Sequence, residues 1–269
     1  MRSYWLLCPL ILTVLAVAPL QAQNLTAEQL QVGPPPMPRA EPSAPAASAE
    51  ELEQRGDELR MEKDYVDALD YYREALRKKR GDSRILNKAG IVELQLQNLR
   101  ESRRDFESAI KHDPQFADAY NNLGVIFYEE KKYGKAIDRY ERAIKLRQDS
   151  ASFYSNLGAV YFCRKEFDKA TQAYSEAAKI DPDIFEHSSH NGIAARMSSP
   201  EDRAHFDYVL AGLFAKAGDA DRALLYLRRA MEEGYKGIDG VFKDEEFAAI
   251  RKDARFTQLM ASRPPAVTE

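Results

Sequence analysis

Along most of the chain, hydrophobic residues recur among polar ones with the spacing of amphipathic helices. From residue 49 onward, apolar side chains recur three and four positions apart, in two runs per block of 34 residues. The blocks 49–82, 83–116, 117–150 and 151–184 follow one another without a gap. This spacing places the apolar side chains of each run on one face of a helix. We therefore expect two helices in every block.

The blocks also share residue types at fixed positions. The stretch YNNLGVIFY at 120–128 returns as YSNLGAVYF at 154–162. Across the four blocks the eighth position is Gly, the twentieth is Ala or Ser, the twenty-fourth is Tyr or Phe, and the twenty-seventh is Ala. Small residues let two helix backbones approach closely, and the rings fill the space beside them. One block cannot bury its apolar faces alone, so we expect the blocks to stack.

This pattern resembles the tetratricopeptide repeat (TPR) family over residues 49–184, and it resumes over residues 204–237 as a fifth unit. The resemblance implies an all-α fold, namely a right-handed α-solenoid of helix-turn-helix units with a short helical cap at its C-terminal end. The departures are few: Arg80 and Gln148 stand where the family often has Pro, and Glu93 stands at an often-aromatic position.

An insert at residues 185–203 separates the fourth and fifth units, and residues 238–269 form the expected cap and tail. Ser199 followed by Pro200 suits the N-cap and first position of a helix, so we expect the fifth helix pair to begin near residue 200. The expected cap covers the last open face with apolar side chains: Phe247, Ile250, Phe256, Leu259 and Met260. The segment KDEEFAAIRKDARFTQLM is similar to tails that follow such repeats in bacterial proteins.

The N-terminal residues carry the pattern of an export signal. The uncharged apolar stretch 6–20 follows Arg2, and Ala22 offers a small residue at a cleavage site. We expect residues 1–22 to be removed as a signal peptide, leaving a periplasmic or secreted protein; retention as a membrane anchor is the alternative. Residues 23–48 hold six prolines and no aromatic residue, which predicts a disordered linker.

Composition and motifs narrow the class of function. The net charge of −4 and the pI of about 5.8 argue against nucleic-acid binding, which normally needs a basic excess. We find no phosphate-binding loop, nucleophile motif or zinc motif, so we expect no enzyme activity and no cofactor. His187 and His190 could form a metal pair beside Glu186, but a polar insert explains them better, and we expect no metal site. After cleavage Cys163 is the only cysteine, so no internal disulfide can form.

The resemblance implies that the first helix of each block lines a concave groove for peptides or partner proteins. The expected groove residues are Asn87, Ile91, Leu94, Gln95, Asn121, Asn122, Val125, Tyr128, Glu129, Ser155, Asn156, Ala159, Phe162 and Cys163. Tyr128 and Phe162 hold the same position in adjacent blocks, on the side expected to be open. Two alternatives remain: the apolar members pack between neighbouring helices, and Asn122 and Asn156 bond within the array.

We therefore expect an exported scaffold or adaptor that binds partner proteins or peptides, with a role in cell-envelope assembly or secretion. The alternative is a homo-oligomeric structural protein of the envelope. A metal-binding or enzymatic role for the insert is the least favoured hypothesis. Some relatives grip a partner's C-terminal carboxylates with basic groove residues. This chain instead places Glu53 and Asp57 there, and Asn121 where a Lys would serve, so an acidic tail is not the expected ligand.

Overall fold

A computed structural model describes residues 47–187 and 199–264. The expected signal peptide, the linker up to residue 46, the centre of the insert and the last five residues lie outside this range. In the described residues every regular element is a helix, which confirms the all-α fold. None of these helices is long and apolar enough to cross a membrane.

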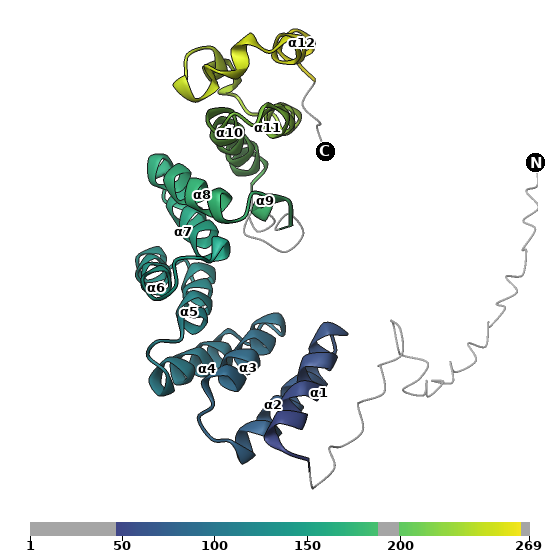
Figure 1. The fold of residues 1–269 in the computed structure, drawn as a ribbon, viewed down its shortest axis with the longest axis vertical. Helices are drawn as coiled ribbons and strands as arrows, with labels where there is room; N and C mark the ends of the chain where they lie inside the picture. Colours follow the sequence, from purple (N-terminus) through teal and green to yellow (C-terminus); the bar gives the residue numbers. More distant parts are fainter. Residues whose placement is uncertain (1–46, 188–198, 265–269) are drawn as a thin grey trace, which may run out of the picture. The chain divides into compact units, whose positions relative to one another are not determined.

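The first eight helices form four successive hairpins (Figure 1). Their bounds are α1 (Ala49–Met61), α2 (Tyr65–Lys78), α3 (Ser83–Gln95), α4 (Leu99–His112), α5 (Ala117–Glu129), α6 (Tyr133–Leu146), α7 (Ala151–Cys163) and α8 (Phe167–Ile180). The first helix of every hairpin thus starts 34 residues after the previous one. Within a hairpin the two helices pack together, and the second helix also packs against the first helix of the next hairpin.

The tight turn between the two helices of a hairpin depends on a left-handed residue at the fifteenth position of each unit. These residues are Lys63, Gln97, Lys131 and Lys165, with φ between 56° and 64°. In the third unit Lys131 N–H donates to the carbonyl of Tyr128 and Lys132 N–H to that of Phe127, both at 2.8 Å. This pair of bonds satisfies the last carbonyls of α5 and reverses the chain within a few residues. The side chains of the fifteenth residues consequently lie at the turn edge of their units.

Each hairpin is closed by an aromatic ring that lies against a glycine. A Cβ atom added to Gly124 would lie 2.6 Å from Tyr140, and one added to Gly158 would lie 2.6 Å from Tyr174. Gly56 and Gly90 have the same relation to Tyr72 and Phe106. All four rings are fully buried or nearly so. The small eighth residue and the large twenty-fourth residue are therefore two halves of one contact.

The fifth hairpin joins the array in the opposite sense. It consists of α10 (Pro200–Ala217) and α11 (Ala220–Glu232), and it follows the short α9 (Ile184–His187). Ring contacts join the fifth hairpin to α8 and α9, and the residue numbers of both partners increase together from one contact to the next. The ring centroids are 4.3 Å apart for Phe167 and His205, 5.4 Å for Tyr174 and Phe206, and 6.3 Å for Phe185 and Phe214. Helix α10 therefore runs in the same direction as α8.

The length of the connection explains this change of direction. Four-residue links join α2 to α3, α4 to α5 and α6 to α7, so each first helix must run back along the helix before it. The 19 residues between α8 and α10 are enough to return along α8, which is about 20 Å long. Ser199 accepts a hydrogen bond from Asp202 N–H at 3.0 Å and Pro200 takes the first position, as the sequence predicts.

The C-terminal residues cover the face of the fifth hairpin. They form three short 3₁₀ helices, η3 (Ile238–Phe242), η4 (Glu245–Phe247) and η5 (Ile250–Lys252), followed by α12 (Ala254–Ser262). The five apolar side chains expected to cover this face are at most 8% exposed, and they belong to one core with α10 and α11. Asp253 caps α12, while Asp244 accepts a hydrogen bond from Tyr208 at 2.6 Å.

One carboxyl group of the fifth hairpin is half-buried next to another acid. Asp207 of α10 is close to Glu233, and the Oε2 atom of Glu233 is buried with no hydrogen-bond partner in the described residues. Burial, and secondarily the charge of Glu233, raises the pKa of Asp207 to about 7, while Arg229 and Arg203 oppose the shift. The folded hairpin therefore favours the neutral form of Asp207 below that pH.

We predict that Gly124→Ala destabilises the array by about 1–3 kcal/mol, because the new methyl group clashes with Tyr140. At the positions of Gly124 and Tyr140, the fifth hairpin has Ala211 and Leu227, and both are fully buried. An Ala and a Leu therefore fit together at this contact. In urea unfolding, the double change Gly124→Ala/Tyr140→Leu should lower the free energy of unfolding by less than the sum of the two single changes. Additive costs would contradict the contact.

We predict that the stability contribution of Asp207 depends on pH. Between pH 3.8 and about 7 the folded state keeps a proton that the unfolded state releases, so stability falls as pH rises through this window. Asp207→Asn should remove this loss and be more stable than the wild type at pH 8, by about 1–2 kcal/mol, with a smaller difference at pH 5. The control is Asp149→Asn, since Asp149 is 85% exposed. An equal difference at both pH values would contradict the assignment.

Candidate partner-binding site

Side-chain amides of the first helices bond to one another along the array. Asn122 donates to Asn87 at 2.9 Å, Asn156 donates to Asn121 at 2.9 Å, and Asn121 donates to Asn122 at 3.1 Å. Asn87 and Asn121 are only 7% and 8% exposed. Of the two roles considered for these amides, the structure shows the bonds within the array. These bonds hold the first helices of the second, third and fourth units in register, because a buried amide needs a hydrogen-bond partner.

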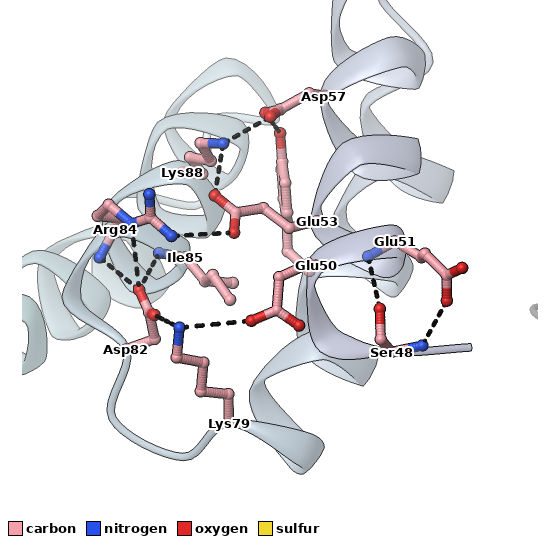
Figure 2. A network of polar contacts seen from close by, with 11 residues as sticks. Ser48, Glu50, Glu51, Glu53, Asp57, Lys79, Asp82, Arg84, Ile85 and Lys88 are labelled. Atoms are coloured by element: carbon pink, nitrogen blue, oxygen red, sulfur yellow. Dashed lines mark hydrogen bonds and ion pairs between the residues drawn. The ribbon is translucent and has the colours of Figure 1, made fainter. Parts of the chain in front are cut away.

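The N-terminal end of this face is acidic and internally neutralised. Lys88 of α3 donates to Glu53 at 2.7 Å and to Asp57 at 2.5 Å, both from α1 (Figure 2). Arg84 also approaches Glu53, with 3.6 Å between Nη2 and Oε2. Asp57 additionally accepts from Tyr72 at 2.7 Å. The nearest cations are therefore engaged by carboxylates of the chain itself, which disfavours a bound carboxylate at this end.

Tyr128 and Phe162 take different roles although they hold the same position in adjacent units. Phe162 is only 4% exposed, because its ring packs against Phe167, His205 and Phe206 at centroid distances of 5.3, 5.3 and 5.9 Å. The expectation that this side was open therefore does not hold for Phe162, which α10 covers. Tyr128 is half-buried, and its hydroxyl lies 3.3 Å from the Cys163 thiol.

A hollow with aromatic walls opens where the third, fourth and fifth units meet. Its volume is about 650 Å³. One wall is formed by the ends and turns of α5 and α7, a second by the first turns of α10, and a third by the segment that follows α11. The rings in these walls are Tyr128, Tyr133, Phe162, Phe167, His205 and Tyr235. We call this the aromatic hollow. It exists because α10 runs parallel to α8 and so brings its N-terminal end to the turn edge of the fourth unit.

The titratable groups in the aromatic walls are held neutral. Burial lowers the pKa of His205, against a smaller opposing effect of Asp202, and its ring stacks on Tyr235 at 5.2 Å. Burial raises the pKa of the Cys163 thiol, and it also raises that of Tyr128. At neutral pH the interior of the hollow is therefore an uncharged aromatic surface that carries a thiol and hydroxyl groups.

Charged residues surround this surface. Lys131, Lys165 and Lys236 contribute cations, and Glu201 and Asp202 of α10 contribute anions. Within the described residues none of these five side chains has an oppositely charged group at ion-pair distance. Glu129 also lines the hollow, but it is engaged within the chain. The hollow thus offers both charge signs to a ligand.

Some of the other expected groove residues pack in the core, and others remain accessible. Ile91, Leu94 and Val125 are half-buried and pack against the core of the third unit, and Ala159 is 2% exposed. Ser155 is half-buried, and Gln95 is exposed. Sequence reasoning did not find Tyr133, Phe167, His205 or Tyr235. The first two are aromatic at the seventeenth position of neighbouring units, which was a usable signal, whereas the other two depend on the direction of α10.

The metal hypothesis for the insert finds no support in the part of the chain that is described. Those residues contain no group of three or more His, Cys, Asp or Glu side chains that could hold a metal ion. The Glu186 carboxylate is engaged by Arg222, with 3.0 Å between Oε1 and Nε. The side chain of His187 and the whole of His190 lie outside the described residues.

Comparison with known proteins identifies the repeats. Sequence profiles described as tetratricopeptide repeat match residues 87–138 and 151–184, and one described as TPR repeat matches residues 124–163. Over 90 residues the chain is 31% identical to the Hsp70-Hsp90 organizing protein 3 of Arabidopsis thaliana and 29% identical to the Hsp70-Hsp90 organizing protein of Triticum aestivum. Each match covers 34% of this chain but only 16% of the relative's length.

Solved structures with the same fold are known from bacteria. The chain resembles the pilF protein of Pseudomonas aeruginosa with a TM-score of 0.52 and 17% identity, over 77% of this chain and 82% of that one. It resembles MamA from Desulfovibrio magneticus RS-1, from residue 41 to its end, with a TM-score of 0.50 and 19% identity, over 71% and 97% of the two chains. At these identities the likeness concerns the fold. Together with the sequence profiles, it shows that this all-α chain contains tetratricopeptide repeats.

Proposed function

We propose that this protein is an exported TPR scaffold that captures partner proteins at the aromatic hollow and acts in cell-envelope assembly or secretion. The observation that carries the proposal is the hollow itself. It is a concave surface of neutral rings with charged groups around it, which is the arrangement of a site for a short partner segment. The apolar rings supply affinity, and the surrounding charges supply selectivity.

The repeat architecture supports a scaffold role over an enzymatic one. In the four regular hairpins the glycines, alanines and buried rings pack the helices together, and the amides hold the first helices in register. The matched plant relatives are named for the organisation of Hsp70 and Hsp90. We do not propose the C-terminal carboxylates of such a protein as the ligand, because Glu53 and Asp57 already neutralise Lys88 where a carboxylate would have to bind.

The export part of the proposal is supported by the sequence. The apolar stretch 6–20 is shorter than the roughly 20 residues that a membrane span needs, it contains two prolines, and Ala22 follows it. A folded body without internal disulfides is compatible with export, since its stability comes from packing along the array.

We predict that Tyr133→Ala and Tyr235→Ala reduce partner capture without unfolding the protein, because both rings line the hollow and are only half-buried. The matched control is Tyr65→Ala, since Tyr65 holds the seventeenth position of the first unit as Tyr133 does in the third. The measurement is a tagged pull-down from the envelope fraction of the native host, with helicity checked by circular dichroism.

Proteins that are retained by the wild type and by Tyr65→Ala but lost with Tyr133→Ala would support capture at the hollow. The same retained set with all variants would move the binding surface elsewhere and contradict the proposal. We prefer these single changes to Phe162→Ala, which would leave a cavity in the core and cost about 3–5 kcal/mol.

We predict that the full-length chain is exported and processed to a protein beginning at Gln23. N-terminal sequencing of protein from the periplasm or medium of a bacterial host is the measurement. Leu12→Arg should block export, because a charge interrupts the apolar stretch. Recovery of an uncleaved chain starting at Met1 in the membrane fraction would instead identify residues 6–20 as a retained anchor.

A further inference from the structure

We propose that the aromatic hollow takes an extended peptide segment of mixed charge, in which an aromatic side chain is flanked by acidic residues on one side and basic residues on the other. This inference rests on the proposed function, because it names the chemistry of the partner at the same site. It is carried by the positions of the charges around the hollow.

The rings in the walls of the hollow determine which side chain of the ligand would anchor it. Phe167 and Tyr235 both lie against the His205 ring, at centroid distances of 4.3 and 5.2 Å. Tyr128 and Tyr133 add a further tilted pair at 5.9 Å. A surface of half-buried rings is best complemented by another ring, because aromatic pairs are stabilised by their ring geometry beyond the area they bury. Because His205 and Cys163 are neutral, they repel neither an acidic nor a basic ligand. The rings therefore determine the aromatic anchor of the ligand but not the charge of the residues on either side of it.

Two lysines of the hollow favour an acidic flank on the ligand. Lys131 and Lys165 hold the same left-handed turn position in adjacent units, with φ of 56° and 62°. The adjacent residues Lys132 and Arg164 form ion pairs with Glu130 and Glu166. Lys131 and Lys165 have no acidic partner in the described residues. Two unpaired ammonium groups at the end of two successive repeats form a surface that favours carboxylates.

Two acidic residues of α10 favour a basic flank on the ligand. Glu201 and Asp202 lie in the first turn of α10, on a different wall of the hollow from the two lysines. Neither has a cation at ion-pair distance in the described residues, although Arg203 beside them pairs with Glu233 at 3.8 Å. Because the cations and these anions come from different elements, a ligand of one sign would be repelled at one wall. A peptide with separated charges meets both walls favourably.

The test uses the full-length protein and four capped synthetic peptides, with binding measured by isothermal titration calorimetry. They are Asp-Asp-Gly-Phe-Gly-Lys-Lys, an all-acidic and an all-basic version, and the mixed version with Ala in place of Phe. The mixed Phe peptide should bind about fivefold more tightly than either single-sign peptide, as expected for two or three exposed ion pairs, and the Ala version should bind more weakly still.

Charge reversal on the protein sharpens the test. Lys131→Glu with Lys165→Glu should transfer the preference to the all-basic peptide, and Glu201→Lys with Asp202→Lys should transfer it to the all-acidic peptide. Lys63→Glu is the matched control, because Lys63 holds the same turn position in the first unit, away from the hollow. It should leave the preference of the wild type unchanged.

Three results would overturn the inference, and they are distinguishable from failure of the proposed function. Equal binding of all Phe peptides, lost in Tyr133→Ala, would remove the charge rule while leaving the hollow as a capture site. No binding of any peptide at millimolar concentration would remove the rule, and the pull-down would then report on the hollow separately. Self-association seen by sedimentation and lost in Lys131→Glu/Lys165→Glu would assign the hollow to a second copy of this chain.

Discussion

The contact between a glycine and an aromatic ring inside each of the four regular hairpins is the constraint on which the rest of the structure depends. In the third unit there is no room for even a methyl group between Gly124 and the Tyr140 ring. Because the two helices of a unit are held at this distance, their outer faces have a fixed spacing and the next hairpin can stack on them. The amide chain from Asn87 to Asn156 then keeps successive first helices in register.

The same regularity explains why the candidate site lies where the repetition changes. Along the four regular units the side chain at the sixth position of a first helix bonds to the fifth position of the unit before it, as Lys88 does to Glu53, Asn122 to Asn87 and Asn156 to Asn121. These amides and carboxylates are therefore already engaged within the array. The long connection after α8 lets α10 run parallel to α8. The rings of Phe167 and His205 then meet, although they belong to different units. Lys165, Glu201 and Asp202 lie near these rings in the walls of the hollow, and none of the three has an ion-pair partner in the described residues.

Much of the fold could be predicted from the sequence because it depends on local periodicity. The 34-residue spacing, the small eighth residue and the Ser199-Pro200 helix start are all visible without coordinates. The direction of α10 could not be predicted, since a link of 19 residues permits either direction and no local signal selects one. For this reason the expected groove included Tyr128 and Phe162 but missed His205 and Tyr235, and the burial of Phe162 under α10 was not foreseen.

Photo-cross-linking in the native host tests most directly whether partners bind at the aromatic hollow. A photoreactive phenylalanine analogue would replace Tyr133, Phe167 or, as the matched position of the first unit, Tyr65. If partners bind at the hollow, we expect the same partner to be cross-linked from positions 133 and 167 and not from position 65. Cross-links from position 65 alone, or equally from all three positions, would contradict it.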